Sequence, residues 1–591
     1  MVNRAGYALA IHVSVAAFVA SALLGAWVAY DRALSVNQLA AVLVGGLLYL
    51  SLARARRPEA LTAAGAFVTL AGALAALYFI AQYGHQAYTV KSGLIARLGQ
   101  ATTFLPNLNG PPLHPNVLAS YLAGALPVGG AMWSASRTRP ARAGWLAVGL
   151  LMAYALLLSA SRGAWLAMGV TAAVYAGLRF QRLAWRVVGL GAALCAAGGL
   201  ALLGLGGDPR QWALVASVAP AALQRLGLYQ NSLRLAQDYF FTGLGLGDTF
   251  GQVYARYSQL SLSTSVGHAH NLPLAIWLNQ GLLGLLAFLA LTLGGAAFIF
   301  QTRRRGAPGA LFEGAWLGVT ALWLHGLTDA PQYSGSLPMF LAVWGLTVAA
   351  GSAAPAPPTA GARPPVPLSR YGWAVAVLLI VGVTAGLGVG RRPILAAWYT
   401  NWGALAETRA DLTPALTAAE RAAAAAEAAV WYRRALAEEP AWPGANRRLG
   451  NLLVAYGDFA AALAPLETAL RAEPHYLATV KGLGLAYTWV GRTETAAVMF
   501  HQLDDPAGME QELYTWGYYR AEQGRPLLTA YAWETAQRMY PERPNLDVWL
   551  LIAEKYRAAG ELEAARRVYH QVLTLEPDQP QALSALAELG P

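Results

Sequence analysis

Polar side chains able to do transfer chemistry stand at the ends of apolar segments in this chain. A histidine pair, His268 and His270, ends a long polar loop, and Asn271 follows it directly. A lone arginine, Arg162, occupies a very short turn between two apolar segments and is followed by Gly163. A neutral imidazole accepts a proton near neutral pH, and a guanidinium binds phosphate oxygens bidentately. These residue types are therefore candidates for proton transfer and phosphate binding.

The elements that must position these residues are apolar. Of the 591 residues, 56% are hydrophobic and only 12% are charged, about half the charged fraction of a soluble protein. A membrane-crossing helix needs about 20 apolar residues, and eleven such spans are predicted. They cover about residues 6–30, 36–53, 61–82, 116–134, 143–160, 163–178, 186–206, 271–300, 310–328, 336–352 and 371–390. The fold class predicted is an all-α, polytopic bundle of transmembrane helices, and the first span is expected to be an uncleaved anchor.

Positive charge predicts the orientation of the spans. Residues 1–392 contain 25 Lys and Arg against 7 Asp and Glu, and every even-numbered span is followed by a short Arg-rich loop. By the positive-inside rule these loops lie in the cytoplasm. The odd-numbered exits, which include the long loops 83–115 and 207–270, are then outside, and so is the C-terminal end. Because the basic part is also the apolar part, a nucleic-acid binder is not expected.

The last part of the chain differs in composition and period. After a membrane domain over 1–392 and a connector over 393–408, residues 409–591 are polar, Ala-rich and predicted to be helical. Small residues and prolines recur about every 34 residues, which is the spacing of tetratricopeptide repeats. The recurring positions include Leu449, Gly450, Gly457, Ala462, Leu483, Gly484, Gly491, Ala496, Ala553, Gly560 and Ala565. Four to five repeats predict an α-solenoid that binds a protein partner, or serves as a spacer or a self-association module.

The chemistry-bearing residues of the membrane part fall on its outer side. The histidines there are His85, His114, His268, His270 and His325. The acids Asp238 and Asp248 are scattered and form no obvious pair, which disfavours a glycoside hydrolase. Cys195 is the only cysteine, and the histidine pairs lack nearby carboxylate or thiolate ligands at the usual spacing. We therefore expect no metal and no disulfide.

Four motifs together indicate a family, and the first in the chain is Gly110-Pro-Pro-Leu-His114-Pro-Asn116. His270-Asn271 is followed, after nine residues, by Gly281-Leu-Leu-Gly284; Ser161-Arg-Gly-Ala-Trp165 and Gly245-Leu-Gly-Asp-Thr-Phe250 precede it. In this order on the outer face, they resemble the superfamily of O-antigen ligases, O-antigen (Wzy) polymerases and bacterial protein O-oligosaccharyltransferases. The resemblance covers roughly residues 60–350, and a fused tetratricopeptide tail also occurs in that superfamily.

The resemblance implies a glycosyltransferase of the cytoplasmic (inner) membrane that builds cell-surface polysaccharide such as lipopolysaccharide. The donor would be a glycan on undecaprenyl diphosphate, and the acceptor a hydroxyl of a lipid, a glycan or a protein; no cofactor is implied. His270 is the candidate base, and Arg162 and Arg225 are the candidates for diphosphate binding. The loop alignment also allows Arg234 or Arg210 in place of Arg225.

Other residues are expected to line the site or to support it. They are His268, Asn271, His114, Asn116 and His325, with Asp329 within reach. The alternative for His270 and Asn271 is a cap of the following span, and for His114 a structured loop. Gly281 and Gly284 are expected to allow close packing or a bend. Outside the superfamily, the alternatives are a transporter of a lipid-linked glycan, whose site would lie at mid-membrane, and a membrane-anchored scaffold.

Overall fold

The computed structural model describes residues 4–83, 85, 93–106, 108, 110–179, 220–261, 266–304, 308–354 and 390–590. Helices are the regular elements throughout these residues, as expected for an all-α protein. The chain divides into two compact units. The first, the membrane unit, comprises residues 1–253 and 264–386; the second, the repeat unit, comprises residues 254–263 and 387–591.

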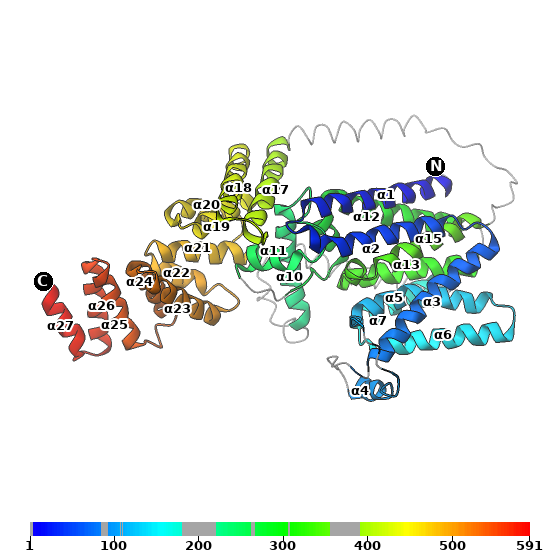
Figure 1. Ribbon diagram of the computed structural model, residues 1–591, viewed down its shortest axis with the longest axis horizontal. Coiled ribbons are helices and arrows are strands. Elements are labelled where there is room, and N and C mark those ends of the chain that lie inside the picture. The colour runs from blue at the N-terminus through cyan, green and yellow to red at the C-terminus, as the bar shows by residue number, and fades with distance from the viewer. Residues whose placement is uncertain are drawn as a thin grey trace. The chain divides into compact units, whose positions relative to one another are not determined.

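The membrane unit is a bundle of long apolar helices (Figure 1). Its helices are α1 (Arg4–Val28), α2 (Arg32–Ala53), α3 (Pro58–Tyr83), α4 (Gly93–Gln100), α5 (Pro115–Ala135), α6 (Arg139–Leu158), α7 (Arg162–Arg179), α10 (Pro220–Asp238), α11 (Phe250–Tyr254), α12 (Leu272–Arg304), α13 (Ala310–Thr328), α14 (Pro331–Ser334) and α15 (Leu337–Ala353). The largest packing partners are α1 with α12, α2 with α15, and α5 with α13. Elements far apart in sequence therefore form the core.

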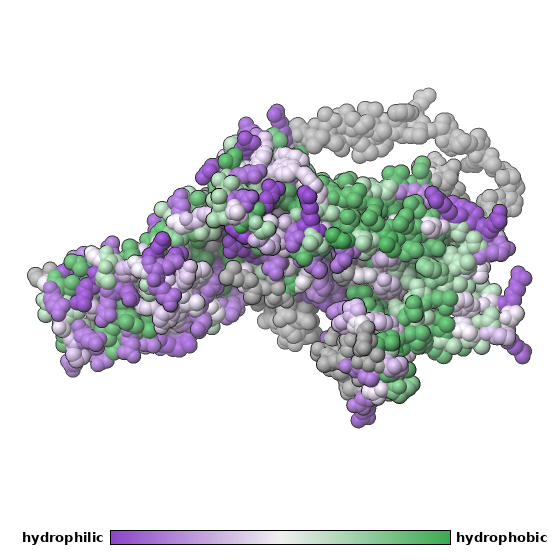
Figure 2. Space-filling view, viewed as in Figure 1, coloured by the Kyte–Doolittle hydropathy of each residue, from purple (hydrophilic) through white to green (hydrophobic). Residues whose placement is uncertain are grey.

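Six of these helices, α1, α2, α3, α5, α6 and α12, are long and apolar enough to cross a membrane. The helices α7, α13 and α15 coincide with three further predicted spans. The predicted spans at 186–206 and 371–390 lie outside the described residues, so the total of eleven stays a prediction. Hydrophobic side chains cover the flank of the bundle, and hydrophilic ones gather at the end where α2 turns into α3 and α5 into α6 (Figure 2).

Glycines in the loop after α10 let the backbone enter the bundle. Gly243, Gly245 and Gly247 all have positive φ, and a Cβ on each would lie within 3 Å of backbone atoms of α12, of Ala29 or of Leu34. In α12 itself, Gly281 has φ 66° and interrupts the helix, while Leu282 donates its backbone N–H to Phe240 and Phe241 carbonyls. The predicted bend at Gly281 is therefore present, and it accommodates this loop.

The repeat unit is a stack of helical hairpins, coloured yellow to red in Figure 1. The pairs are α17 (Arg391–Leu412) with α18 (Ala418–Glu438), α19 (Pro443–Ala455) with α20 (Phe459–Ala472), α21 (Leu477–Trp489) with α22 (Thr493–Phe500), α23 (Pro506–Glu522) with α24 (Pro526–Met539), and α25 (Leu546–Ala558) with α26 (Leu562–Leu575), followed by α27 (Pro580–Leu589). Gly457, Gly491, Gly524 and Gly560 turn the last four pairs at positive φ, the conformation that glycine adopts without strain.

Small residues allow the close helix packing that the repeat pattern predicts. A Cβ on Gly450 would lie 2.4 Å from Leu466, and one on Gly484 would lie 2.4 Å from Phe500. The residues predicted as a connector, 393–408, belong to α17, where Gly403 packs against the ring of Tyr432 in α18. The first hairpin therefore begins before the predicted repeat boundary.

Candidate functional site

The centre of the site is Asp329, the residue that ends α13. Its side chain is 5% exposed, and its Oδ1 accepts hydrogen bonds from His268 Nε2 at 3.0 Å and His270 Nδ1 at 2.9 Å. The backbone N–H of Ala330 also donates to Oδ1, at 2.8 Å, and Asn116 Nδ2 donates to Oδ2. A carboxylate offers about four acceptor positions, so these four donors satisfy it.

These donors keep Asp329 ionised. Burial alone would raise the pKa of this carboxyl, but the hydrogen bonds from His268 and His270 outweigh burial and hold the pKa well below its usual range. An ionised carboxylate only accepts hydrogen bonds, so each imidazole presents an N–H to it. In a neutral ring the lone pair then lies on the other nitrogen, which is Nε2 in His270 and Nδ1 in His268.

The backbone at His270 has an uncommon conformation, and hydrogen bonds hold the residues around it. His270 has φ 50°, in the left-handed region, which is uncommon for a residue with a side chain. The Tyr229 hydroxyl of α10 donates to the His270 carbonyl at 2.8 Å. Asn271 accepts from the Leu274 N–H at 3.1 Å and so caps α12, while its Nδ2 donates to the Leu327 carbonyl at 3.3 Å. The capping role weighed for the His-Asn pair thus belongs to Asn271, and His270 is left to contact Asp329.

Two arginines approach the same end of α13. Arg225 of α10 donates from Nη1 to the Thr328 carbonyl at 2.6 Å. Arg162 is exposed and begins α7, and a Cβ on the adjacent Gly163 would lie 2.5 Å from Thr328 Oγ1. The turn before it is tight, with Ala160 at φ 50°. The Arg162 turn and Arg225 therefore both meet α13 at Thr328, one residue from Asp329.

His114 and His325 take different positions. His114 caps α5, because its Nδ1 accepts the Asn116 backbone N–H at 3.2 Å, and it thereby orients a donor to Asp329. His325 is fully buried one turn before Asp329, and its ring carbon Cδ2 lies 3.3 Å from the position of a Cβ on Gly163. Neither ring nitrogen of His325 has a hydrogen-bond partner among the described residues.

The cluster lies at the opposite helix ends from the arginine-rich turns. Asn116 stands at the start of α5, whereas α5 ends just before Arg137 and α6 begins at Arg139. Similarly, α12 starts after Asn271 and ends at Arg303 and Arg304. Basic residues thus lie at one end of these helices and the His–Asp cluster at the other, and the assignment of the two ends to the inner and outer faces stays a prediction.

The cluster also has the composition of a cation site. Three residues, His268, His270 and Asp329, each offer one ligand atom, and these atoms lie within 4.8 Å of one another. Both nitrogen–oxygen distances, 3.0 and 2.9 Å, are those of hydrogen bonds. A bound ion would compete with these hydrogen bonds for the same atoms.

The structure brings together most of the predicted site residues. His268, His270, Asn271, Asn116, Arg225 and His325 all lie around the end of α13, and Arg162 lies beside it. The alternative Arg210 lies outside the described residues. Two contributions were not predicted: the Tyr229 hydrogen bond, and the role of Asp329 as the shared acceptor. Its position directly after a span, on the same side as the histidines, was the only signal in the sequence.

Comparison with protein families supports this organisation. Residues 147–289 match the family model described as O-antigen ligase, and residues 546–589 match a tetratricopeptide repeat. The first match includes Arg162, Arg225 and His270, while Asp329 lies beyond it. A search of curated proteins finds no match. The two family matches confirm the resemblance seen in the motifs: an O-antigen ligase-type membrane domain followed by tetratricopeptide repeats.

Proposed function

We propose that this protein transfers a glycan from undecaprenyl diphosphate to an acceptor hydroxyl at the outer face of the cytoplasmic membrane. The family match supports membrane glycan processing of the ligase or polymerase type. The specific transfer reaction is supported by the contact of His270 with an ionised Asp329, beside Arg225 and the Arg162 turn. One end of the bundle thus combines a base with two cations.

In the proposed reaction, His270 acts as the general base. The acceptor oxygen attacks the anomeric carbon of the glycan, and its proton moves to Nε2 of His270. The bond between the anomeric carbon and the phosphate oxygen breaks, and undecaprenyl diphosphate leaves with the electron pair. Asp329 orients the ring through Nδ1 and stabilises the imidazolium that forms, as in other histidine–aspartate pairs.

The arginines have the complementary task of stabilising the leaving group. A diphosphate gains negative charge as the glycosidic bond breaks, and guanidinium groups bind phosphate oxygens while staying charged. Arg225 uses one N–H on Thr328, a contact that fixes the direction of its side chain. Arg162 is exposed at the helix end, where a lipid headgroup can reach it.

The repeat unit supports an outer location for the C-terminal part. Residues 254–263 come from the loop that leads to His268, and they belong to the same compact unit as residues 387–591. We infer that the repeats lie on the side of the membrane that this loop occupies, which is also what an odd number of spans requires. Reporter fusions near residue 400 test this inference, and a cytoplasmic signal there would refute it.

The acceptor separates the members of the superfamily. Purified protein is supplied with undecaprenyl-diphosphate-linked glycan and one of three acceptors: a lipid A core, a second glycan or a protein. We expect one acceptor class to become glycosylated, and Arg162→Ala and His270→Ala to abolish transfer without affecting membrane insertion. Full transfer by both variants would contradict the proposal. Movement of the lipid-linked glycan across the bilayer without transfer would favour the transporter instead.

A further inference from the structure

A short part of the outer loop is enclosed by the repeat unit. We call residues Tyr254–Ser261 the strap; it includes a π-helical turn at Ala255–Gln259. The turn closes with a hydrogen bond from the Ser261 N–H to the Ala255 carbonyl at 2.9 Å, and Leu260 adopts φ 47°. Tyr257 and Ser258 are buried although they belong to a loop. The strap is therefore a folded segment with a binding surface on the repeats.

The first contact of the strap is an ion pair. Arg256 Nε lies 2.9 Å from Asp411 Oδ2 on α17, and the Tyr257 hydroxyl donates to the same oxygen at 3.1 Å. Burial alone would lower the pKa of Arg256, but the charge and hydrogen bond of Asp411 outweigh burial and raise it. Both side chains of the strap thus converge on one carboxylate of the first hairpin.

An arginine of the second hairpin holds the Tyr257 ring. Arg448 of α19 lies with Cζ 3.9 Å from the ring centroid, within the range of a cation–π contact. Its Nη1 is fixed by Glu407 at 3.1 Å, and both side chains are almost fully buried. The Arg448 side chain is therefore held in place, and the Tyr257 ring packs against it.

The third hairpin contacts the C-terminal end of the strap. The Ser258 hydroxyl and the Tyr476 hydroxyl are 2.9 Å apart, and both residues are buried. Lys481 of α21 donates from Nζ to the Leu260 carbonyl at 3.1 Å and pairs with Glu512 at 2.7 Å. Three successive hairpins therefore bind the strap through side-chain and backbone groups, as a receptor binds a peptide.

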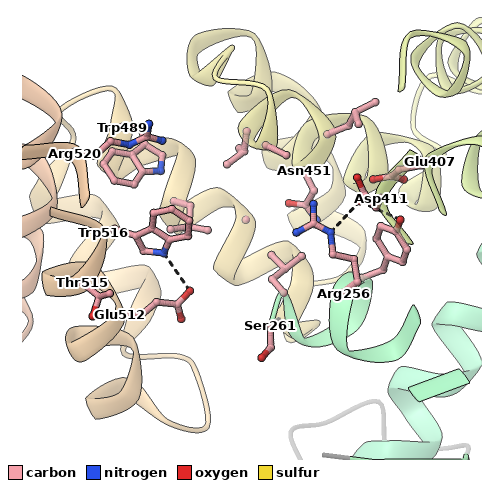
Figure 3. Close-up of a pocket in the computed structure, with 17 residues that line it drawn as sticks. Arg256, Ser261, Glu407, Asp411, Asn451, Trp489, Glu512, Thr515, Trp516 and Arg520 are labelled. Atoms are coloured by element: carbon pink, nitrogen blue, oxygen red, sulfur yellow. Dashed lines mark hydrogen bonds and ion pairs between the residues drawn. The ribbon is translucent and has the colours of Figure 1, made fainter. Parts of the chain in front are cut away.

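The strap also forms part of a cavity in the repeat unit (Figure 3). This cavity has a volume of about 630 Å³. It is lined on one side by Arg256 and Ser261, and on another by Trp489 and Trp516. The strap therefore closes one side of the cavity, and the space beside the tryptophans stays open. The segment that binds the repeats in this structure is therefore part of the same chain.

We propose that the strap is an internal ligand of the repeat domain, and that its binding positions the loop carrying His268 and His270. The second half of this inference rests on the proposed function. Only six residues separate Ser261 from His268. Displacement of the strap is therefore expected to shift the segment that carries the histidine pair. In this account the repeats are a working part of the transferase, and the strap residues are positioning residues.

The binding half is tested without any activity measurement. A protease site is inserted after Gly390, before α17, and the full-length membrane protein is cleaved and washed. We expect the released fragment to stay with the membrane part, and to wash off in Ser258→Trp and in Arg256→Glu combined with Tyr257→Ala. Arg409→Glu, an exposed charge reversal on α17, is the matched control and stays bound. Loss of the wild-type fragment on cleavage, or full retention in both strap variants, would overturn the proposal.

The positioning half is tested by a double-mutant cycle on the uncleaved protein. The two strap variants are expected to lower kcat for transfer at least 10-fold, with little change in KM for the lipid-linked donor. In a His270→Asn background, the same strap changes are expected to have almost no further effect, because the group they position is gone. Unchanged kcat in the strap variants, or equal losses in both backgrounds, would overturn positioning. If even the intact protein transfers nothing, the proposed function fails while the wash experiment still decides the binding of the strap.

Discussion

The two units each bury a carboxylate among nitrogen donors, but they leave those donors in different states. In the membrane unit, Asp329 is buried while the side chains of His268 and His270 remain 36% and 28% exposed. In the repeat unit, Glu407 and Arg448 are 4% and 2% exposed. The rings of the first cluster therefore remain partly exposed, whereas the second cluster is enclosed. The same kinds of residue form the candidate site in one unit and part of the core in the other.

The protonation of the two carboxyls differs in the same way. Four donors converge on Asp329 and its pKa is lowered. Glu407 receives hydrogen bonds from Arg448 at 3.1 Å and Tyr432 at 2.5 Å, both to the same oxygen. Burial exceeds the effect of Arg448 and raises the pKa of Glu407 to about 7. The pKa of a buried carboxyl thus falls where several donors surround it and rises where burial dominates.

The largest effect that separates the two clusters is expected for Asp329→Asn. The amide keeps the shape of the side chain but cannot accept from all of the present donors, so the two rings lose their common orientation. We expect transfer to fall about 100-fold, the lower range of a general-base contribution. Asp248→Asn, an exposed acid of the same loop region, is the control and should transfer at the wild-type rate. Normal transfer by Asp329→Asn at an equal protein level would remove the cluster from the mechanism.

Replacement of the arginines is expected to have a smaller effect. Arg225→Lys keeps the charge but removes the planar group that binds two phosphate oxygens. We expect kcat/KM for the lipid-diphosphate donor to fall about 10-fold, with a loss in kcat because the leaving group gains charge as the bond breaks. Kinetics at varied donor concentration measure this loss, with Arg139→Lys at the opposite end of the bundle as the control. An unchanged kcat/KM in both Arg225→Lys and Arg162→Lys would argue against diphosphate binding here.

In the enclosed cluster, substitution should alter stability and not transfer chemistry. The pKa of Glu407 is higher in the native protein than its ordinary value of 4.5, so the native state binds the proton more tightly. This stabilisation is full below about pH 4.5 and is lost as the pH rises toward 7. The unfolding midpoint of the repeat unit should therefore fall by a few degrees over this window, and Glu407→Gln should flatten the dependence.

Thermal unfolding of the full-length protein at several pH values measures this effect. Glu427→Gln, on the exposed face of α18, is the matched control and should keep the wild-type dependence. The same slope in Glu407→Gln and in the wild type would show that another group titrates.

Chelation should have the smallest effect of all. Both oxygens of Asp329 already accept hydrogen bonds, including those from His268 and His270. Transfer assayed with and without a strong chelator of divalent cations is expected to be equal. Loss of transfer on chelation, with recovery on adding one divalent cation, would reassign these three side chains as metal ligands.

Much of the candidate site could be predicted from the sequence because its residues end apolar segments. A position at a span end is a local property, so the sequence predicts His270 and Arg162 at one face, whereas Arg225 is a candidate only through the family resemblance of the long loop. The shared acceptor could not be assigned in the same way. The role of Asp329 depends on three separate chain segments meeting at the end of α13, and no local pattern records such a meeting.

The strap shows the same limit in the repeat unit. The spacing of small residues predicted helical hairpins, because each glycine or alanine acts within its own repeat. The strap lies about 150 residues before Asp411, its first ion-pair partner in the repeats. A contact at that separation depends on tertiary packing, so the sequence predicts a long outer loop at 207–270 with candidate site residues, but no contact between that loop and the repeats.

In the proposed mechanism, His270 removes the proton of the acceptor hydroxyl. The most direct test measures the undecaprenyl diphosphate released and the glycan transferred in a single turnover by wild type, His270→Asn and His85→Asn. Asparagine tolerates the left-handed backbone at position 270, so this change removes the base and keeps the local fold. We predict equal amounts of both products in wild type and His85→Asn, and at least a 100-fold slower turnover in His270→Asn. Wild-type turnover by a correctly inserted His270→Asn protein would contradict the account.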